Sequence, residues 1–156
     1  MAVIKIQDIA HVRFAAPDLA VMRAFLEDFG MHCVEEGGRL YGKGADGRPF
    51  VHATHKGDAK FLAVGFRAAD VAELEKLAAS EGVLVEDLNE PGGGKIVRLS
   101  DPDGYSVEIV AGQAKAAPTP PPTDPLRNSA FAQPRLRASV RLDAAPAHVR
   151  HRPRGP

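Results

Sequence analysis

The chain has 156 residues, of which 44% are hydrophobic and 26% are charged, and it has one cysteine. This length and composition predict one globular domain and exclude fibrous and coiled-coil chains. A single cysteine excludes a disulfide framework and a multi-cysteine zinc site. No stretch approaches the ~20 apolar residues that a membrane span needs, and the N-terminus does not resemble a secretory signal. We therefore expect a cytoplasmic protein.

The net charge of zero hides two oppositely charged parts. Residues 1–112 contain 12 Lys and Arg against 18 Asp and Glu, whereas residues 113–156 contain 8 against 2 and hold 9 of the 13 prolines. We interpret residues 1–112 as the folded domain and residues 113–156 as a disordered Pro/Arg-rich tail or linker remnant. The arginines of this tail are separated by Pro and Ala and lack an aromatic platform, so we expect no nucleic-acid partner.

The residue pattern in the first half of the domain predicts one strand, a helix and three further strands. Residues 9–14 alternate between polar and apolar types, which is typical of a strand with one buried face. Asp18 suits the N-cap of a helix in which Met22, Phe25, Leu26 and Phe29 share one face. The next predicted strands are residues 33–36, 39–42 and 50–54, the first two joined by a Gly37-Gly38 turn.

The same order of elements recurs 52 residues later, where Asp18 corresponds to Asp70 and Gly30 to Gly82. A second predicted helix is followed by the loop Asn89–Gly94 and then by strands at 95–99 and 105–110. Neither copy would bury its apolar face well alone. We therefore predict an α+β domain made of two βαβββ units, at about residues 5–56 and 57–112.

Two segments carry a resemblance to a known family. The Asp101-Pro102-Asp103-Gly104 turn followed by Val107-Glu108-Ile109, together with the internal repeat, resembles the vicinal oxygen chelate superfamily. This superfamily includes glyoxalase I, bleomycin-resistance proteins and extradiol ring-cleavage dioxygenases. Residues 61–71 and 110–112 look most like the N-terminal domain of two-domain extradiol dioxygenases. The resemblance implies a cup-like mixed sheet around a divalent metal ion.

The resemblance also implies four positions for metal ligands, on the first and last strand of each unit. These positions are His11, one residue of 50–54, Ala63 and Glu108. His52 is the best match to the second position, so the candidate ligands are His11, His52 and Glu108, and His55 is expected to face solvent. Two histidines and a carboxylate suit Fe(II) or another divalent metal.

A second interpretation of the same residues needs no metal. Ala63 offers no lone pair to a cation, and the positive charge of Arg13 would repel one. Glu108 is then a buried carboxylate paired with Arg13, Arg67 or His11. The loop Asn89–Gly94 is expected at the rim of the cup.

Three functions remain open at this point. The resemblance implies the non-catalytic domain of an extradiol dioxygenase-like protein of aromatic catabolism, which would pack against a missing catalytic domain or form a homodimer. The alternatives are a stand-alone metalloenzyme, either a dioxygenase or glyoxalase-like, that acts on a small aromatic or vicinal-oxygen substrate, and a metal-free small-molecule binding protein of the bleomycin-resistance kind. Ala63 favours the first and the third.

Overall fold

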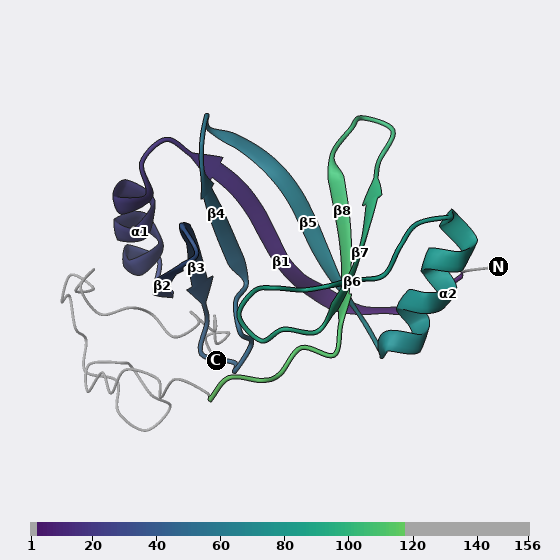
Figure 1. Cartoon of the computed structure of the whole chain (residues 1–156). Coiled ribbons are helices and arrows are strands. Elements are labelled where there is room, and N and C mark those ends of the chain that lie inside the picture. The colour runs from purple at the N-terminus through teal and green to yellow at the C-terminus, as the bar shows by residue number, and fades with distance from the viewer. Residues whose placement is uncertain (1–2, 118–156) are drawn as a thin grey trace, which may run out of the picture.

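The structure is a computed structural model that describes residues 3–117. Within these residues the chain forms two helices and one eight-stranded sheet (Figure 1). The helices are α1 (Leu19–Asp28) and α2 (Val71–Glu81). The strands are β1 (Ile6–Ala16), β2 (His32–Glu36), β3 (Arg39–Lys43), β4 (His52–Lys56), β5 (Lys60–Ala68), β6 (Glu86–Asp87), β7 (Lys95–Ser100) and β8 (Ser106–Ala111).

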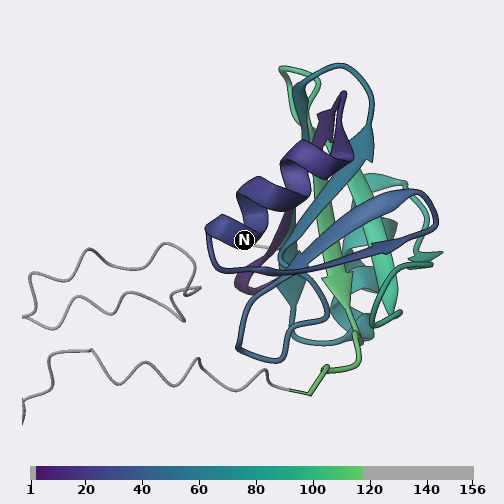
Figure 2. The same ribbon diagram turned by 90° about the vertical axis from the view of Figure 1, so that its left-hand side faces the viewer.

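The sheet has the strand order β2-β3-β4-β1-β5-β8-β7-β6. Its two halves repeat one arrangement, because β1 pairs in parallel with β4 and β5 pairs in parallel with β8. The halves meet where β1 and β5 pair antiparallel. Figure 2 shows that the sheet curls instead of lying flat. The predicted α+β class, with a mixed sheet, is confirmed.

Local signals explain where the helices begin and end. The side chain of Asp18 accepts hydrogen bonds from the backbone N–H groups of Ala20 and Val21, and Asp70 accepts one from Glu73, so both are N-caps as predicted. Gly82 ends α2 with a φ of 68°, in the left-handed region that glycine adopts without strain. Neither helix in the described part of the chain is long and apolar enough to cross a membrane.

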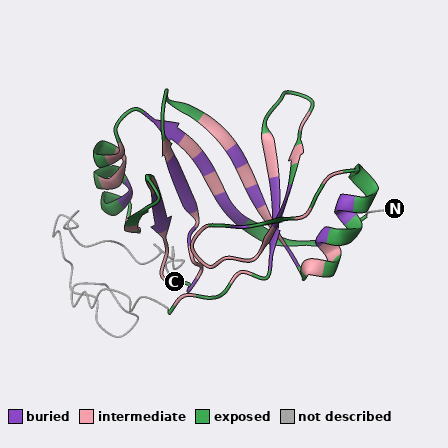
Figure 3. Cartoon of the chain, in the orientation of Figure 1, coloured by how far each residue is buried: buried purple, intermediate pink, exposed green. Residues whose placement is uncertain are grey.

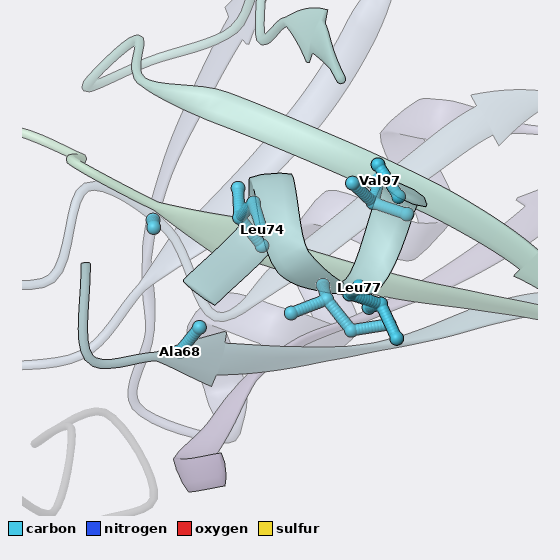
Figure 4. Packing of buried hydrophobic residues seen from close by; sticks show 7 residues of the cluster. Ala68, Leu74, Leu77 and Val97 are labelled. Carbon is cyan, nitrogen blue, oxygen red and sulfur yellow. The ribbon is translucent and has the colours of Figure 1, made fainter. Parts of the chain in front are cut away.

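The two helices, which lie at opposite ends of the sheet, bury very different amounts of apolar surface (Figures 1 and 3). Helix α2 buries Leu74, Leu77 and Ala78 against β5, β7 and β8 in the main apolar cluster (Figure 4). Helix α1 buries only Leu26, and Phe25 and Phe29 are 59% and 67% exposed. The predicted apolar face of the first helix is therefore only partly buried.

The predicted tail falls mostly outside the described residues. Residues 118–156 are not described, and nothing in the structure bears on that part of the prediction. The part of the predicted tail that is described, residues 113–117, lies against the domain. The backbone N–H of Ala114 donates to Gly92 and that of Ala116 donates to Gly47. The ordered chain thus extends beyond residue 112, the predicted end of the domain.

Candidate functional site

The structure brings His11 and Glu108 together. His11 lies on β1 and Glu108 on β8, on either side of Gly65 of β5, to which both are register partners. Their side chains share one face of the sheet, and His11 Nε2 lies 2.7 Å from Glu108 Oε2. Both residues are buried, with exposed fractions of 1% and 4%. Two predicted site residues that are 97 positions apart in sequence therefore form one buried hydrogen-bonded pair.

Arg13 joins this pair to a second carboxylate. Its Nε donates to Glu108 Oε2 over 2.7 Å, and its two terminal nitrogens donate to Glu90 over 2.7 and 2.5 Å. Arg39 on β3 adds a further hydrogen bond to Glu90, at 2.9 Å. We call these five residues, His11, Arg13, Arg39, Glu90 and Glu108, the ion-pair cluster. Bidentate arginine–carboxylate pairs are strong and geometrically specific, so the cluster fixes the loop that carries Glu90 over the sheet.

Small residues on the neighbouring strands make room for the cluster. Arg13 lies between Ala53 of β4 and Ala63 of β5 in the sheet register, and both alanines are buried. His11 lies opposite Gly65, where a Cβ atom would come within 2.6 Å of both ring nitrogens of the imidazole. A side chain larger than hydrogen at position 65 would displace His11.

Phe50 closes the apolar side of the cluster. Its ring centroid lies 5.0 Å from that of His11, and the guanidinium carbon of Arg13 lies 5.8 Å from the same centroid. Phe50 is only 2% exposed. An aromatic face within about 6 Å of a guanidinium attracts it and excludes water, which strengthens the nearby ion pairs.

Glu90 is the acidic residue of the cluster that the sequence did not reveal. It lies on the loop Asn89–Gly94, which turns back across the sheet towards β1 and β3 (Figure 1). Gly92, Gly93 and Gly94 all have positive φ angles, and the Gly93 N–H donates to the Glu90 carbonyl. The signal in the sequence is a single carboxylate in a glycine-rich loop, which predicts a place at the rim of the cup but no pairing with Arg13.

The charges of the cluster shift two pKa values in opposite directions. Burial raises the pKa of Glu108, but hydrogen bonds from His11 and Arg13 and the charge of Arg13 outweigh it and lower the pKa to about 2. Burial likewise lowers the pKa of Arg13, but its hydrogen bonds to Glu90 and Glu108 raise it above the ordinary value. Both groups therefore stay charged inside the domain, as the second interpretation of Glu108 predicted.

The structure places His52 on the other face of β4. His52 is the register partner of Val12 and stacks on Phe14 at 5.2 Å, while its Nδ1 lies 3.3 Å from the hydroxyl of Thr54. Burial lowers its pKa. The equivalent of Glu108 in the first half is Ala53, because Ala53 pairs with Arg13 as Glu108 pairs with Gly65. A shift of one residue along a strand reverses the face, so His52 does not join His11 and Glu108.

His55 is the histidine of β4 that lies on the same face as the cluster. It pairs with Ala15 and Arg39 in the register and is half-buried, whereas the sequence predicted a solvent-facing side chain. Burial lowers its pKa, and the charges of Arg39 and Arg13 lower it further. Its Nε2 is buried and has no hydrogen-bond partner within residues 3–117.

The donor set around the cluster does not fit a divalent metal ion. Two of the four positions at which the resemblance implies ligands carry alanine, namely Ala53 and Ala63. The remaining two, His11 and Glu108, are hydrogen-bonded to each other, and a guanidinium group lies against the carboxylate. Within residues 3–117, no three or more His, Cys, Asp or Glu side chains are grouped to hold a metal ion. A cation would have to displace Arg13 and would find only two protein ligands.

Several solved structures share this fold. The Mn(II)-bound glyoxalase from Novosphingobium aromaticivorans is 22% identical, with a TM-score of 0.66, over 75% of this chain and 42% of its own. The 2,3-dioxygenase LapB from Pseudomonas sp. KL28 is 24% identical, with a TM-score of 0.64, over 74% and 44%. An extradiol ring-cleaving dioxygenase from Brevibacterium fuscum is 21% identical, with a TM-score of 0.62, over 72% and 34%.

These likenesses confirm the predicted fold, which the chain shares with a glyoxalase and with extradiol dioxygenases. The chain spans less than half the length of each of these three proteins. No protein-family model matches the sequence, and no curated protein matches it significantly.

Proposed function

We propose that this chain, which has the fold of the vicinal oxygen chelate superfamily, is the non-catalytic domain of an extradiol dioxygenase-like protein. One observation carries the proposal: Arg13 lies between two alanines at positions where the resemblance implies metal ligands, and its guanidinium pairs with Glu108. Ring cleavage of this type needs a metal with open positions for the substrate and for O2. The ion-pair cluster leaves His11 and Glu108 engaged with other side chains.

The lengths of the similar structures support the same role. Two of them are dioxygenases, and the likeness covers 44% and 34% of their chains. The rest of each of those chains lies outside the likeness, and we propose that this domain packs against a catalytic domain. The small aromatic substrate would then bind in that catalytic domain.

We also propose that the protein is cytoplasmic. Its single cysteine, Cys33, is free, which suits a reducing compartment.

Turnover and metal content test this proposal together. The full chain is loaded anaerobically with Fe(II), mixed with catechol and exposed to O2, while absorbance follows yellow ring-fission product. Metal analysis of the same sample measures the ratio of iron to protein. We expect no product and well below one iron per chain. Stoichiometric iron with product formation, both lost in His11→Ala, would establish a stand-alone dioxygenase instead.

One observation favours the metal-free binding alternative. A pocket of about 290 Å³, near the lower end of the range for small-molecule sites, lies apart from His11 and Glu108 and is lined in part by Tyr41, Pro49 and Pro91. A flat aromatic ligand would pack against the two prolines and against Val34, which lines the same pocket and is exposed. Saturable binding of catechol-type ligands without metal, measured by calorimetry and lost in Val34→Asp, would support this alternative.

A further inference from the structure

We propose that Arg13 is a built-in replacement for a metal ion, and that His11 and Glu108 are the remaining half of a divalent-cation site that Arg13 closes. This inference rests on the proposed non-catalytic role, because an active metal centre could not also contain the guanidinium. It explains what occupies the site in this chain and predicts how a metal could be admitted.

The internal repeat shows how the space is shared. In the repeat, Ala63 corresponds to His11 and Gly65 corresponds to Arg13. The antiparallel register of β1 and β5 then places His11 opposite Gly65 and Arg13 opposite Ala63. Each large side chain of the first half therefore lies beside a small residue of the second half. On its other side, Arg13 lies beside Ala53 of β4, which is the counterpart of Glu108 in the first half.

The charges in the cluster agree with such a replacement. Glu108 is 5% exposed in its side chain, and an unpaired carboxylate so deeply buried is very unfavourable. A divalent cation would supply the compensating charge in a metal site, and here the guanidinium supplies it. The second carboxylate, Glu90, also has a 5% exposed side chain and accepts the other two N–H groups of Arg13. The loop that carries Glu90 thus completes the coordination of the guanidinium.

The proposal predicts that two substitutions open the site. Arg13→Ser removes the resident cation, and Ala63→His supplies a third donor on the strand next to His11. Two histidines and one glutamate then form a set that binds Mn(II) or Fe(II). Titration of the full-length double variant with Mn(II), followed by electron paramagnetic resonance and calorimetry, should give one bound ion per chain. Its Kd should be lower than that of the unmodified chain by about tenfold or more.

Matched controls separate ligation from the opening of space. Arg13→Ser combined with Ala63→Phe removes the same cation and places a ring at position 63 but adds no donor, so its Kd for Mn(II) should be higher than that of the double variant by about tenfold or more. Adding His11→Ala to the double variant gives the triple substitution R13S, A63H and H11A, which takes away one of the three donors and should lose the bound ion. Circular dichroism and thermal melting establish that each variant is folded.

Two results would overturn the inference. One is a folded R13S, A63H variant whose Mn(II) affinity equals that of the R13S, A63F control. The other result concerns the unmodified chain and does not depend on the folding of a variant. It is the selective broadening of the amide resonances of His11, Gly65 and Glu108 when one equivalent of Mn(II) is added per chain. Ring-cleavage activity of the unmodified chain would instead overturn the proposed function. A failure of the double variant to bind metal leaves the proposed function intact, so the two ideas fail separately.

Discussion

Arg13 and Ala63 lie directly opposite each other where the two halves of the sheet meet. Ala63 is the counterpart of His11 in the repeat, so the second half has a methyl group where the first half has an imidazole. This difference between the halves gives Arg13 the space to reach Glu108 and Glu90. A nearly symmetric scaffold thereby acquires one asymmetric centre of ion pairs, and that centre ties the loop Asn89–Gly94 to the sheet.

Removing the cation of the cluster should strongly destabilise the domain. Arg13→Met keeps much of the side-chain volume but leaves Glu90 and Glu108 buried without their shared partner. Breaking a buried ion pair from one side costs about 3–5 kcal/mol. We expect a loss of this size in the free energy of unfolding, measured by urea denaturation at neutral pH.

Arg39→Met is the matched control for Arg13→Met. Arg39 also donates to Glu90, but its side chain is 41% exposed, so water can replace it. Exposed ion pairs contribute about 0–1 kcal/mol, and the control should lose no more than that. Equal losses in the two variants would contradict the view that burial of Arg13 sets the energy of the cluster.

Glu108 should make the stability of the domain depend on pH in the acid range. Its pKa in the folded chain is about 2, below the ordinary value of 4.5. The folded state therefore favours the carboxylate, and this contribution is fully present above about pH 4.5 and is lost as the pH falls towards 2. A difference of this size corresponds to about 3 kcal/mol. Urea denaturation between neutral pH and pH 3 should show about 2 kcal/mol of this loss, because Glu108 is still mostly ionised in the folded chain at pH 3.

Glu108→Gln provides the comparison for this pH dependence. The variant should be less stable than the unmodified chain at neutral pH, because the amide carries no charge to pair with Arg13. The difference between the two should shrink as the pH falls below about 4.5, because Glu108 then binds a proton in the unfolded state of the unmodified chain, which stabilises that state relative to the folded one. Two stability curves that stay parallel across this range would show that Glu108 does not titrate as described.

Local signals predicted much of the fold, and long-range register decided the site. The caps at Asp18 and Asp70 and the alternation in residues 9–14 depend on neighbours in sequence, so they could be recognised directly. Alternation shows that residues 50–54 have two faces, but it does not show which face meets Glu108. That choice depends on the pairing of β4 with β1, which places Ala53 beside Arg13 and turns His52 away. The predicted alternation along residues 50–54 is therefore correct, but the face that meets Glu108 carries Ala53 and not His52.

Glu90 was beyond sequence analysis for a similar reason. Its pairing with Arg13 spans 77 residues and depends on the direction in which a glycine-rich loop leaves the sheet. By contrast, the pairing of Glu108 with His11 or Arg13 could be anticipated. His11 and Arg13 lie on the first strand of the repeat and Glu108 lies on the last, and the repeat places both strands at the centre of the domain.

Gly65 should be essential for the position of His11. In Gly65→Ala the new methyl group would lie within 2.6 Å of both imidazole nitrogens, so the ring must move away from Glu108. Overpacking of this kind costs about 1–3 kcal/mol. We expect that loss in urea denaturation, together with a change in the histidine ring resonances measured by NMR.

Gly44→Ala is the control for Gly65→Ala. Gly44 does not have a positive φ, and the nearest atom to an added Cβ would be the Asp46 carboxylate oxygen at 3.9 Å. A compatible glycine-to-alanine change stabilises slightly, by about 0.4–1 kcal/mol, through the unfolded chain. If Gly65→Ala behaved like this control, the close contact between β5 and the imidazole would be contradicted.

The two helices should respond very differently to the same loss of apolar side chain. Phe25 and Leu77 occupy equivalent positions in the repeat, but Leu77 is 7% exposed in the main cluster and Phe25 is 59% exposed. Leu77→Ala should cost about 2–5 kcal/mol, because it leaves a cavity between α2 and the sheet. Phe25→Ala should change the stability by less than about 1 kcal/mol, as exposed sites usually do. Urea denaturation of both variants under the same conditions measures the contrast.

A large loss in Phe25→Ala would mean that the outer face of α1 is covered in solution. Val21 and Phe29 are exposed beside Phe25, so a second chain bound there would bury all three. Binding of that kind makes the unfolding midpoint depend on protein concentration, whereas a monomer shows no such dependence. Urea denaturation is therefore repeated over a wide range of protein concentrations. A midpoint that rises with concentration indicates that a second chain covers α1. A constant midpoint, together with a small loss in Phe25→Ala, supports an exposed outer face of α1.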